Sequence, residues 1–391
     1  MNERYDLLVV GGGPAGCYTA KAAAEHGIRV LVVEKDREIG VPVRCAEGVG
    51  EPGLREFFEP DPRWVANQIE GFSFFAPDGT QVDIANREIG YVLERRIFDR
   101  EIARLAAEAG AEIWTRAMAI GMTNEGVPRK VTIHHLGKSH PIEAKIVVGA
   151  DGTESRVGRW AGLRTACSLH DIEIGAQYTL ADLKINPRRC QLWFGHDVAP
   201  GGYLWVFPKG DGKANVGVGI SGEFSETRSP FDYLDRFVET HFPSASKLGA
   251  VAGAVPCSGG LKRFVADGVL LVGDAAHQVN PLSGGGIVNA LKAARIAGRV
   301  AAEALSDGDV SRKRLSAYER EWRNLLGKAH RRYYRLKEGI FSLSDETLNR
   351  TARSMKKLEY EKRTLARLFR LALFKHPSLL LEIPKLFFEM G

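Results

Sequence analysis

The chain has 391 residues, of which 44% are hydrophobic and 26% charged, and this balance excludes a disordered chain and a small disulfide-held scaffold. No apolar run reaches the ~18–20 residues that a membrane-spanning helix needs, and the N-terminus shows no secretory signal pattern. Five scattered cysteines without a CxxC pair argue against a disulfide framework, a zinc site and an iron–sulfur cluster. They favour a reducing, cytoplasmic setting.

The formal net charge of +6 is unevenly distributed along the chain. Residues 311–391 hold 20 Lys and Arg against 9 Asp and Glu, an excess of +11, whereas the remaining residues carry −5. A basic tail on a mildly acidic body favours a local contact with anionic lipid headgroups, and it argues against a nucleic-acid partner. A solvated helical surface is the alternative interpretation.

The predicted elements alternate in type along the chain. Short apolar runs predict buried strands at 5–11, 28–34, 145–151 and 269–276. Helices are expected at 14–26, 97–110 and 287–305, and the composition of 311–391 is helical. From about 170 to 265, β-rich segments between Gly, Pro and Asp turns predict an antiparallel sheet.

The first motif is Gly11-Gly12-Gly13-Pro14-Ala15-Gly16, a G-x-G-x-x-G between a predicted strand and a predicted helix. In that setting Gly11 permits a tight turn, Gly13 lets the backbone approach a pyrophosphate, and Gly16 allows close helix–strand packing. Glu34 ends the second strand, where a carboxylate accepts hydrogen bonds from ribose hydroxyls. The carboxylate favours FAD or NAD over NADP.

Two later motifs also follow predicted strands. Gly149-Ala150-Asp151-Gly152 is one, and Val272-Gly273-Asp274-Ala275-Ala276-His277 is the other, with Asp274 suited to a ribityl or pyrophosphate contact. The order of the three motifs resembles the para-hydroxybenzoate hydroxylase class of FAD proteins over residues 1–310. That resemblance implies that the backbone amides of 281–287 lie against the flavin ring. For His277, a ligand contact and a plain capping role both remain open.

Four further segments resemble the geranylgeranyl reductase family, in particular the digeranylgeranylglycerophospholipid reductases, which saturate the isoprenoid chains of archaeal-type ether lipids. The segments are PVRCAEG (42–48), YVLERRIFD (91–99), GRWAGL (158–163) and GYLWVFPKG (202–210). The resemblance implies FAD bound by residues carried over by motif, namely Ala15, Glu34, Cys45, Ala46, Gly48, Arg95, Ala119, Asp274, Gly286 and Ile287. Gly11, Gly13, Gly16 and Gly285 complete the predicted cofactor-binding set.

Three aromatic residues are spaced to share one face of a strand. Tyr203, Trp205 and Phe207 stand at i, i+2 and i+4, which suits a flat flavin and a long apolar chain, or else an ordinary sheet face. Cys45 follows Arg44, and a neighbouring cation lowers a thiol pKa, although a lone cysteine also serves as a small buried hydrophobe. Cys45, Tyr203 and Trp205 are the predicted catalytic residues. No metal site is predicted, and the proton donor stays unassigned.

The predicted function is FAD-dependent reduction of C=C bonds in geranylgeranyl chains, by hydride transfer from reduced flavin. NAD(P)H and a ferredoxin-like protein both remain open as the electron donor. Rival functions are reduction of prenyl chains on chlorophyll or menaquinone precursors, aromatic monooxygenation, and lipid binding without turnover. An electron-transfer flavoprotein–quinone oxidoreductase is disfavoured, because it needs an iron–sulfur cysteine cluster.

The predicted fold class is α/β (α+β overall), with three parts. A discontinuous Rossmann-type FAD-binding domain spans 1–165 and 266–310, with part of 40–95 contributing to the substrate side. An inserted antiparallel substrate domain spans 166–265, and a basic helical region spans 311–391. Leu and Phe lie among basic residues in 362–390, and Pro377 and Pro384 break the run; this fits a helix on a membrane surface, a cover over a lipid groove, or ordinary core packing. A cytoplasmic, peripherally membrane-associated protein is expected.

Overall fold

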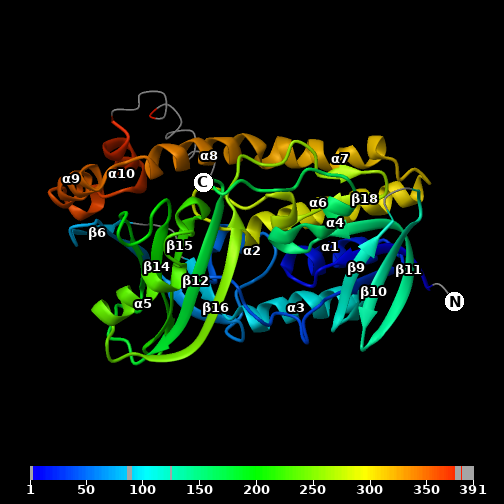
Figure 1. Ribbon diagram of the computed structural model, residues 1–391, viewed down its shortest axis with the longest axis horizontal. Coiled ribbons are helices and arrows are strands. Elements are labelled where there is room, and N and C mark those ends of the chain that lie inside the picture. The colour runs from blue at the N-terminus through cyan, green and yellow to red at the C-terminus, as the bar shows by residue number, and fades with distance from the viewer. Residues whose placement is uncertain (1–2, 86–89, 124–125, 375–379, 381–391) are drawn as a thin grey trace. The chain divides into compact units, whose positions relative to one another are not determined.

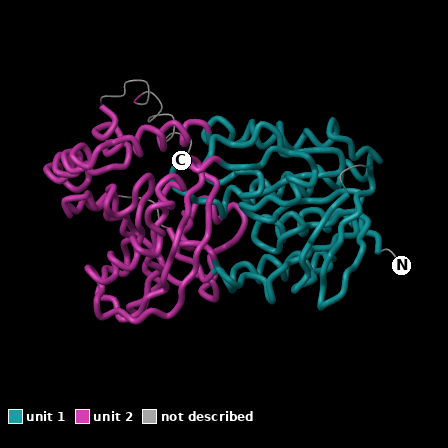
Figure 2. Tube along the Cα trace, viewed as in Figure 1, with its two compact units in different colours: residues 1–43, 95–167, 258–330 teal, residues 44–94, 168–257, 331–391 magenta. Residues whose placement is uncertain are grey.

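The computed structural model describes residues 3–85, 90–123, 126–374 and 380. The chain forms two compact units, each assembled from three separate segments (Figure 2). Unit 1 comprises 1–43, 95–167 and 258–330, and unit 2 comprises 44–94, 168–257 and 331–391.

Unit 1 is built on a mainly parallel sheet with the strand order β17-β18-β11-β1-β2-β8, extended by β9 and β10 (Figure 1). Its strands are β1 (Glu3–Val10), β2 (Val30–Val33), β8 (Glu112–Trp114), β9 (Ala117–Met122), β10 (Arg129–His135), β11 (Lys138–Gly149), β17 (Val265–Ala266) and β18 (Val269–Leu271). The central strands β1, β2, β11 and β18 pair in parallel, so their carboxyl ends meet at one edge of the sheet. Loops that leave this edge are the usual ligand-binding loops of such sheets.

Small residues pack the helices of unit 1 closely. Its helices are α1 (Pro14–Ala24), α3 (Arg95–Glu108), α4 (Arg156–Trp160), α6 (Ile287–Ser306) and α7 (Arg312–Trp322). Helix α1 packs on α6, and a Cβ at Gly298 would lie 2.7 Å from the Cβ of Ala22. The four residues of β2 are all buried, as the apolar run predicts for a strand covered on both faces.

Unit 2 contains a seven-stranded sheet with the order β16-β12-β15-β14-β13-β5-β6 and a three-stranded sheet with the order β3-β7-β4. The strands are β3 (Gly48–Gly50), β4 (Val65–Ile69), β5 (Gly71–Phe75), β6 (Gln81–Ile84), β7 (Gly90–Leu93), β12 (Ile172–Ala181), β13 (Arg189–Trp193), β14 (Tyr203–Gly210), β15 (Lys213–Ser221) and β16 (Ser246–Pro256). The helices are α2 (Glu51–Arg55), α5 (Pro230–His241), α8 (Lys328–Phe341), α9 (Asp345–Lys356) and α10 (Leu365–Ala372); α8 begins at the end of unit 1.

The two faces of the seven-stranded sheet differ in chemistry. Helix α5 lies beside β12 and β15 (Figure 1). On that face, apolar residues of β12, β14 and β15 pack with α5 into a core that includes Leu180, Leu204, Val218 and Leu234. Because side chains alternate along a strand, the residues between them point to the other face. That other face carries the aromatic residues of β14 and the candidate site described below.

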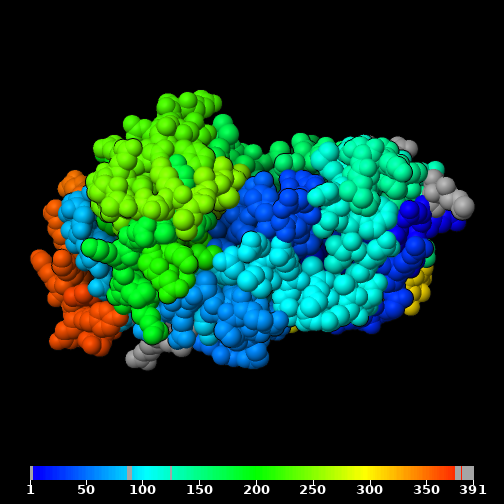
Figure 3. All heavy atoms as spheres, turned by 90° about the horizontal axis from the view of Figure 1, so that it is seen from below, coloured from blue at the N-terminus to red at the C-terminus, as the bar shows by residue number. Residues whose placement is uncertain are grey.

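The described part of the tail packs internally. Leu365, Leu368 and Leu371 of α10 lie against a cluster that contains Ile84 of β6 and Met355 of α9. In Figure 3, the orange atoms of this helical region lie beside the light-blue atoms of the β5–β6 hairpin. Core packing, one of the three predicted roles, therefore accounts for this part; residues 375–379 and 381–391 lie outside the described residues. Among the described helices, none combines the length and apolar character needed to cross a membrane.

The mixed α/β fold class is confirmed, with local differences. The strand predicted over 269–276 ends at Leu271, and Gly273–Ala276 forms a 3₁₀ turn, because Gly273 adopts a φ of +66°. In the compact units, 44–94 belong to unit 2, and part of 40–95 is predicted on the substrate side; the helical region divides, with 311–330 in unit 1.

Candidate active site

The glycine loop after β1 forms the first part of a group we call the cofactor cradle (Gly11, Gly13, Glu34, Asp151, Asp274 and Gly286). Gly11 has a φ of +109°, and a side chain there or at Gly16 would overlap a backbone carbonyl. By contrast, a Cβ at Gly13 would meet no atom within 4 Å. The tight turn and the open backbone surface are what a pyrophosphate contact requires.

Glu34 is held beside this loop at the end of β2. Its Oε2 accepts a hydrogen bond from the backbone N–H of Gly12 at 2.6 Å, and its Oε1 accepts one from the N–H of Asp36 at 2.9 Å. The carboxylate is therefore oriented by backbone donors, as a ribose-binding acid needs to be.

Two more carboxyl groups follow the neighbouring strands. Asp151 accepts a hydrogen bond from the N–H of Val157 at 2.9 Å through Oδ2, whereas its buried Oδ1 has no partner within the described residues. Burial raises the pKa of Asp151 and also that of Asp274. A Cβ at Gly286 would lie 3.4 Å from Oδ1 of Asp274, so this acid sits at the start of α6.

The predicted ligands Arg95 and Ala119 have different surroundings. Arg95 forms a two-pronged ion pair with Asp99, at 2.6 and 2.7 Å, and its charge partly offsets the raised pKa of Asp274. Ala119 is 5% exposed in the core of unit 1, where it pairs with Ile133 of β10. Arg95 therefore lies within electrostatic reach of the cradle, whereas the Ala119 side chain serves packing.

The segment before α6 is a closed backbone loop. The N–H of Asn280 donates to the carbonyl of Gly285 at 2.9 Å, and the N–H of Gly284 donates back to the carbonyl of Asn280 at 2.9 Å. No side chain caps the N-terminus of α6 at Gly286, as far as the described residues extend. An uncapped 20-residue helix, the open Gly13 surface and the orphaned Asp151 oxygen together fit FAD.

His277 has a structural role in unit 1. Its ring nitrogens lie 2.8 Å from Ser258 Oγ and 3.1 Å from the carbonyl of Thr165, and the residue is 2% exposed. The adjacent Gln278 accepts from the N–H of Gly273 and donates to the hydroxyl of Tyr318, both at 2.8 Å. Tyr318 lies on α7, far from Gln278 in the sequence. The motif around Asp274 therefore gives no sign of the hydrogen bond between Gln278 and Tyr318.

In unit 2, Tyr203, Trp205 and Phe207 lie on one face of β14, as their spacing predicts; we call these three residues the aromatic face. Each is partly buried, whereas Leu204 and Val206 between them are buried in the core. The rings of Tyr203 and Trp205 meet edge to face with centroids 6.0 Å apart. A wall of this kind offers a broad apolar surface with few polar groups.

Glycines on the neighbouring strands make room for Trp205. A Cβ at Gly217 would overlap the indole, and Cβ atoms at Gly175 and Gly219 would lie 3.8 and 3.7 Å from it. The register places Gly217 opposite Trp205, and Gly219 opposite both Gly175 and Tyr203. The glycine pattern of β12 and β15 therefore shapes the aromatic face.

Hydrogen bonds connect Trp205 to the Cys45 loop. The indole N–H donates to Oε1 of Gln177 at 3.0 Å, and Nε2 of Gln177 donates to the carbonyl of Cys45 at 3.1 Å. The thiol sulfur of Cys45 accepts from the N–H of Glu47 at 3.2 Å. Gln177 thus couples two of the predicted catalytic residues.

Residues of β14 and β15 also hold the part of the Cys45 loop that follows Cys45. Asn215 donates to the carbonyl of Ala46 at 3.3 Å and to the carboxylate of Glu47 at 2.6 Å, and Lys209 pairs with the same carboxylate. A Cβ at Gly48 would lie 2.7 Å from Phe207. Of the predicted cofactor contacts, Gly48 therefore lies against Phe207 of the aromatic face, and Ala46 is held through its carbonyl by Asn215.

Cys45 differs from most of the other cysteines in accessibility. Cys17, Cys190 and Cys257 are buried, whereas Cys45 and Cys167 are partly exposed. Burial raises the pKa of Cys17 and of Cys190, which makes both poor nucleophiles.

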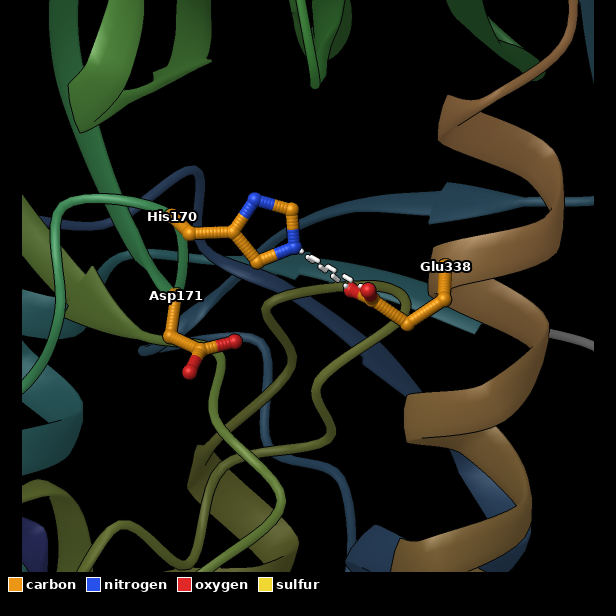
Figure 4. A group of neighbouring side chains, drawn as sticks. All are labelled: His170, Asp171 and Glu338. Carbon is orange, nitrogen blue, oxygen red and sulfur yellow. Dashed lines mark hydrogen bonds and ion pairs between the residues drawn. The ribbon is translucent and has the colours of Figure 1, made fainter.

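His170, Asp171 and Glu338, one imidazole and two carboxyl groups, lie close together where α8 passes beside the start of β12 in unit 2. His170 lies 3.0 Å from the carboxylate of Glu338, with Asp171 adjacent (Figure 4). The ammonium of Lys337 lies 3.0 Å from Asp171 and 3.3 Å from Glu338, so a cation of the protein already neutralises the acids. We interpret these contacts as interactions that hold α8 against the segment before β12.

Three family models match separate parts of the chain, and known proteins match nearly all of it. A model described as the geranylgeranyl reductase catalytic domain matches residues 171–255, a NAD(P)-binding Rossmann-like domain matches 9–56, and an FAD binding domain matches 258–332. The digeranylgeranylglycerophospholipid reductases of Methanocella arvoryzae and Methanothrix thermoacetophila are each 46% identical to this chain. The alignments cover 98% and 97% of this chain and 99% and 98% of the relatives.

A solved structure extends the similarity to the fold. A geranylgeranyl bacteriochlorophyll reductase-like protein from Thermoplasma acidophilum matches with a TM-score of 0.90 and 36% identity, covering 99% of this chain and 100% of that one. These levels of identity and coverage, together with the cradle, identify an FAD-dependent oxidoreductase, and the chain belongs to the digeranylgeranylglycerophospholipid reductases of the geranylgeranyl reductase family.

Proposed function

We propose that this protein saturates the C=C bonds of geranylgeranyl chains on archaeal-type ether phospholipids. The observation that carries the proposal is the 46% identity, over almost the full length, to reductases named for that substrate. The aromatic face supports it, because an apolar chain is held best by a broad apolar wall. When bound, reduced FAD supplies the hydride.

We assign the remaining roles from the geometry of each unit. The cofactor cradle of unit 1 holds FAD, with Glu34 toward the ribose and the Gly13 backbone toward the pyrophosphate. Tyr203, Trp205 and Cys45 of unit 2 hold the reacting double bond. An isolated alkene has no carbonyl to polarise, so orientation and exclusion of water contribute much of the catalysis.

Mass spectrometry tests the activity directly. A digeranylgeranyl ether phospholipid is incubated anaerobically with the chemically reduced holoprotein, and each saturated bond adds two hydrogens to the lipid mass. FAD-dependent mass gain supports the function. Unchanged lipid from a reducible, FAD-loaded protein contradicts it, and prenylated chlorophyll and menaquinone precursors are then tested in the same assay.

We also propose that the basic C-terminal region contacts an anionic membrane surface. Leu365, Leu368 and Leu371 face the interior, whereas Arg367 and Arg370 are exposed on the opposite side of α10. Such a helix binds through charge rather than by insertion, so attachment should weaken as salt rises. Co-sedimentation with phosphatidylglycerol vesicles, but not with phosphatidylcholine vesicles, is the expected result; equal binding to both contradicts the proposal.

The natural electron donor is NAD(P)H or a ferredoxin-like protein. Anaerobic bleaching of the flavin absorbance by each donor separately distinguishes them. A donor that bleaches the flavin only when lipid is present would act after substrate binding.

A further inference from the structure

Glu173 belongs to the same sheet face as Tyr203 and Trp205, although neither a sequence motif nor the roles above include it. On β12 it alternates with Gly175 and Gln177, while Ala176 and Tyr178 point into the core on the other face. A Cβ at Gly202 would lie 3.0 Å from Oε2 of Glu173, and a Cβ at Gly219 would lie 3.8 Å from it. The carboxyl group therefore occupies the space that these glycines leave beside Tyr203.

Both carboxyl oxygens of Glu173 are shielded from solvent and have no hydrogen-bond partner in the part of the chain that the structure describes. A buried carboxylate without donors is strongly unfavourable, whereas a neutral carboxyl group is much less so. Burial accordingly raises the pKa of Glu173 to about 8, against the lowering effects of Lys337 and His170. At pH 7 about nine-tenths of the Glu173 side chains then carry a proton.

The charged groups around Glu173 are committed to other partners. Lys337 of α8 donates to Asp171 at 3.0 Å and to the carbonyl of Cys257 at 3.1 Å. His170 contacts Glu223 and Glu338, each at 3.0 Å. Neither cation forms an ion pair with Glu173 among the described contacts, so the proton stays on the carboxyl group.

Three other titratable groups in this region are the phenol of Tyr203 and the thiols of Cys45 and Cys257. The pKa of Tyr203 is raised first by burial and then by Cys257, Glu173 and Cys45. The Tyr203 phenol is therefore a weaker acid than Glu173. Glu173 is protonated at neutral pH, and it releases its proton more readily than the Tyr203 phenol does. Both properties suit a general acid.

We propose that Glu173 is the catalytic acid of the reduction, a role that rests on the proposed function. One alkene carbon gains the hydride with its electron pair, and the π pair forms the second C–H bond with the proton of Glu173. The Glu173 O–H bond breaks and its electrons remain on the carboxylate, which regains a proton from solvent between turnovers. The hydride would come from bound reduced FAD, which would be the reductant that balances this step.

The test compares the full-length FAD-loaded protein with Glu173→Gln, which keeps the shape but has no acidic proton, and with Glu173→Asp. Glu239→Gln, an exposed glutamate on α5, is the matched control. Infrared difference spectra of the oxidised wild type should show a protonated carboxyl band at pH 7 that falls to about half its intensity near pH 8 and is largely lost above pH 9. The band should be missing in Glu173→Gln and present in the control.

Single-turnover oxidation of the reduced flavin by lipid gives the second readout. Glu173→Gln should slow this step by about 10²-fold or more, with unchanged chemical reduction of the flavin, and Glu173→Asp should restore part of the rate. A wild-type rate in Glu173→Gln, or no titrating band in the wild type, overturns the role of Glu173 alone. If the wild type itself leaves the lipid unreduced, the proposed function fails and the catalytic role fails with it.

Discussion

The buried acid Glu173 makes the stability of the protein depend on pH in a calculable way. Its pKa rises from 4.5 in an exposed chain to about 8 in the fold, so the neutral form stabilises the fold below pH 4.5 and that contribution is lost as pH rises toward 8. Each pKa unit corresponds to about 1.4 kcal/mol. Relative to Glu173→Gln, the free energy of unfolding of the wild type should therefore fall by about 4 kcal/mol between pH 5 and pH 9.

Thermal unfolding of the two proteins at matched pH values measures this difference. For a chain of 391 residues, about 4 kcal/mol corresponds to a relative shift in Tm of about 5 °C. The amide of the Glu173→Gln variant does not titrate between pH 5 and pH 9. The free-energy cost of burying it is therefore the same at both pH values and adds only a constant to the Tm difference. If the Tm difference between the wild type and Glu173→Gln stays the same from pH 5 to pH 9, the raised pKa of Glu173 is refuted. The Tm difference between the wild type and the control Glu239→Gln should stay constant over this range.

Three further changes probe the two units. Gly16→Ala should abolish FAD binding, seen as loss of the flavin absorbance after purification, because the new Cβ overlaps the Gly11 carbonyl; retained flavin would contradict the close packing. Trp205→Phe removes the 3.0 Å bond to Gln177 and should lower the free energy of unfolding by about 1–3 kcal/mol in denaturant titration, whereas an unchanged midpoint would show that the bond contributes nothing. Lys337→Met leaves the partly exposed Asp171 without its ammonium partner and should lower the free energy of unfolding by about 1–3 kcal/mol, and an unchanged stability would mean that water replaces the ammonium.

The fold of unit 1 can be read from the sequence because its signals are local. Each parallel strand is a short apolar run, and the chemistry sits in the few residues that follow it, as at Gly11, Glu34 and Asp274. Sheet geometry then brings these strand ends to one edge without further information. The strands between 44 and 94 carry weaker alternation and pair with distant segments, such as β5 with β13, so they are not evident from local pattern.

The polar part of the aromatic face depends on strand register, which the sequence alone does not specify. Gln177 meets Trp205 only because β12 pairs with β15 at Gly217 and β14 pairs with β15 at the same residue. A shift of one residue would turn Gln177 into the core and Ala176 outward. The identity of the aromatic residues is therefore predictable, whereas the amide that connects Trp205 to Cys45 is not.

The glycines of unit 2 provide the signal that sequence reasoning overlooked. Gly217 and Gly219 alternate in β15, where glycine weakens a strand, so their presence indicates that something must approach the backbone closely. Trp205 fills the space above Gly217, and the carboxyl group of Glu173 lies beside Gly202 and Gly219. The alternate glycines Gly217 and Gly219 thus mark the face on which the side chains of Trp205 and Glu173 come together.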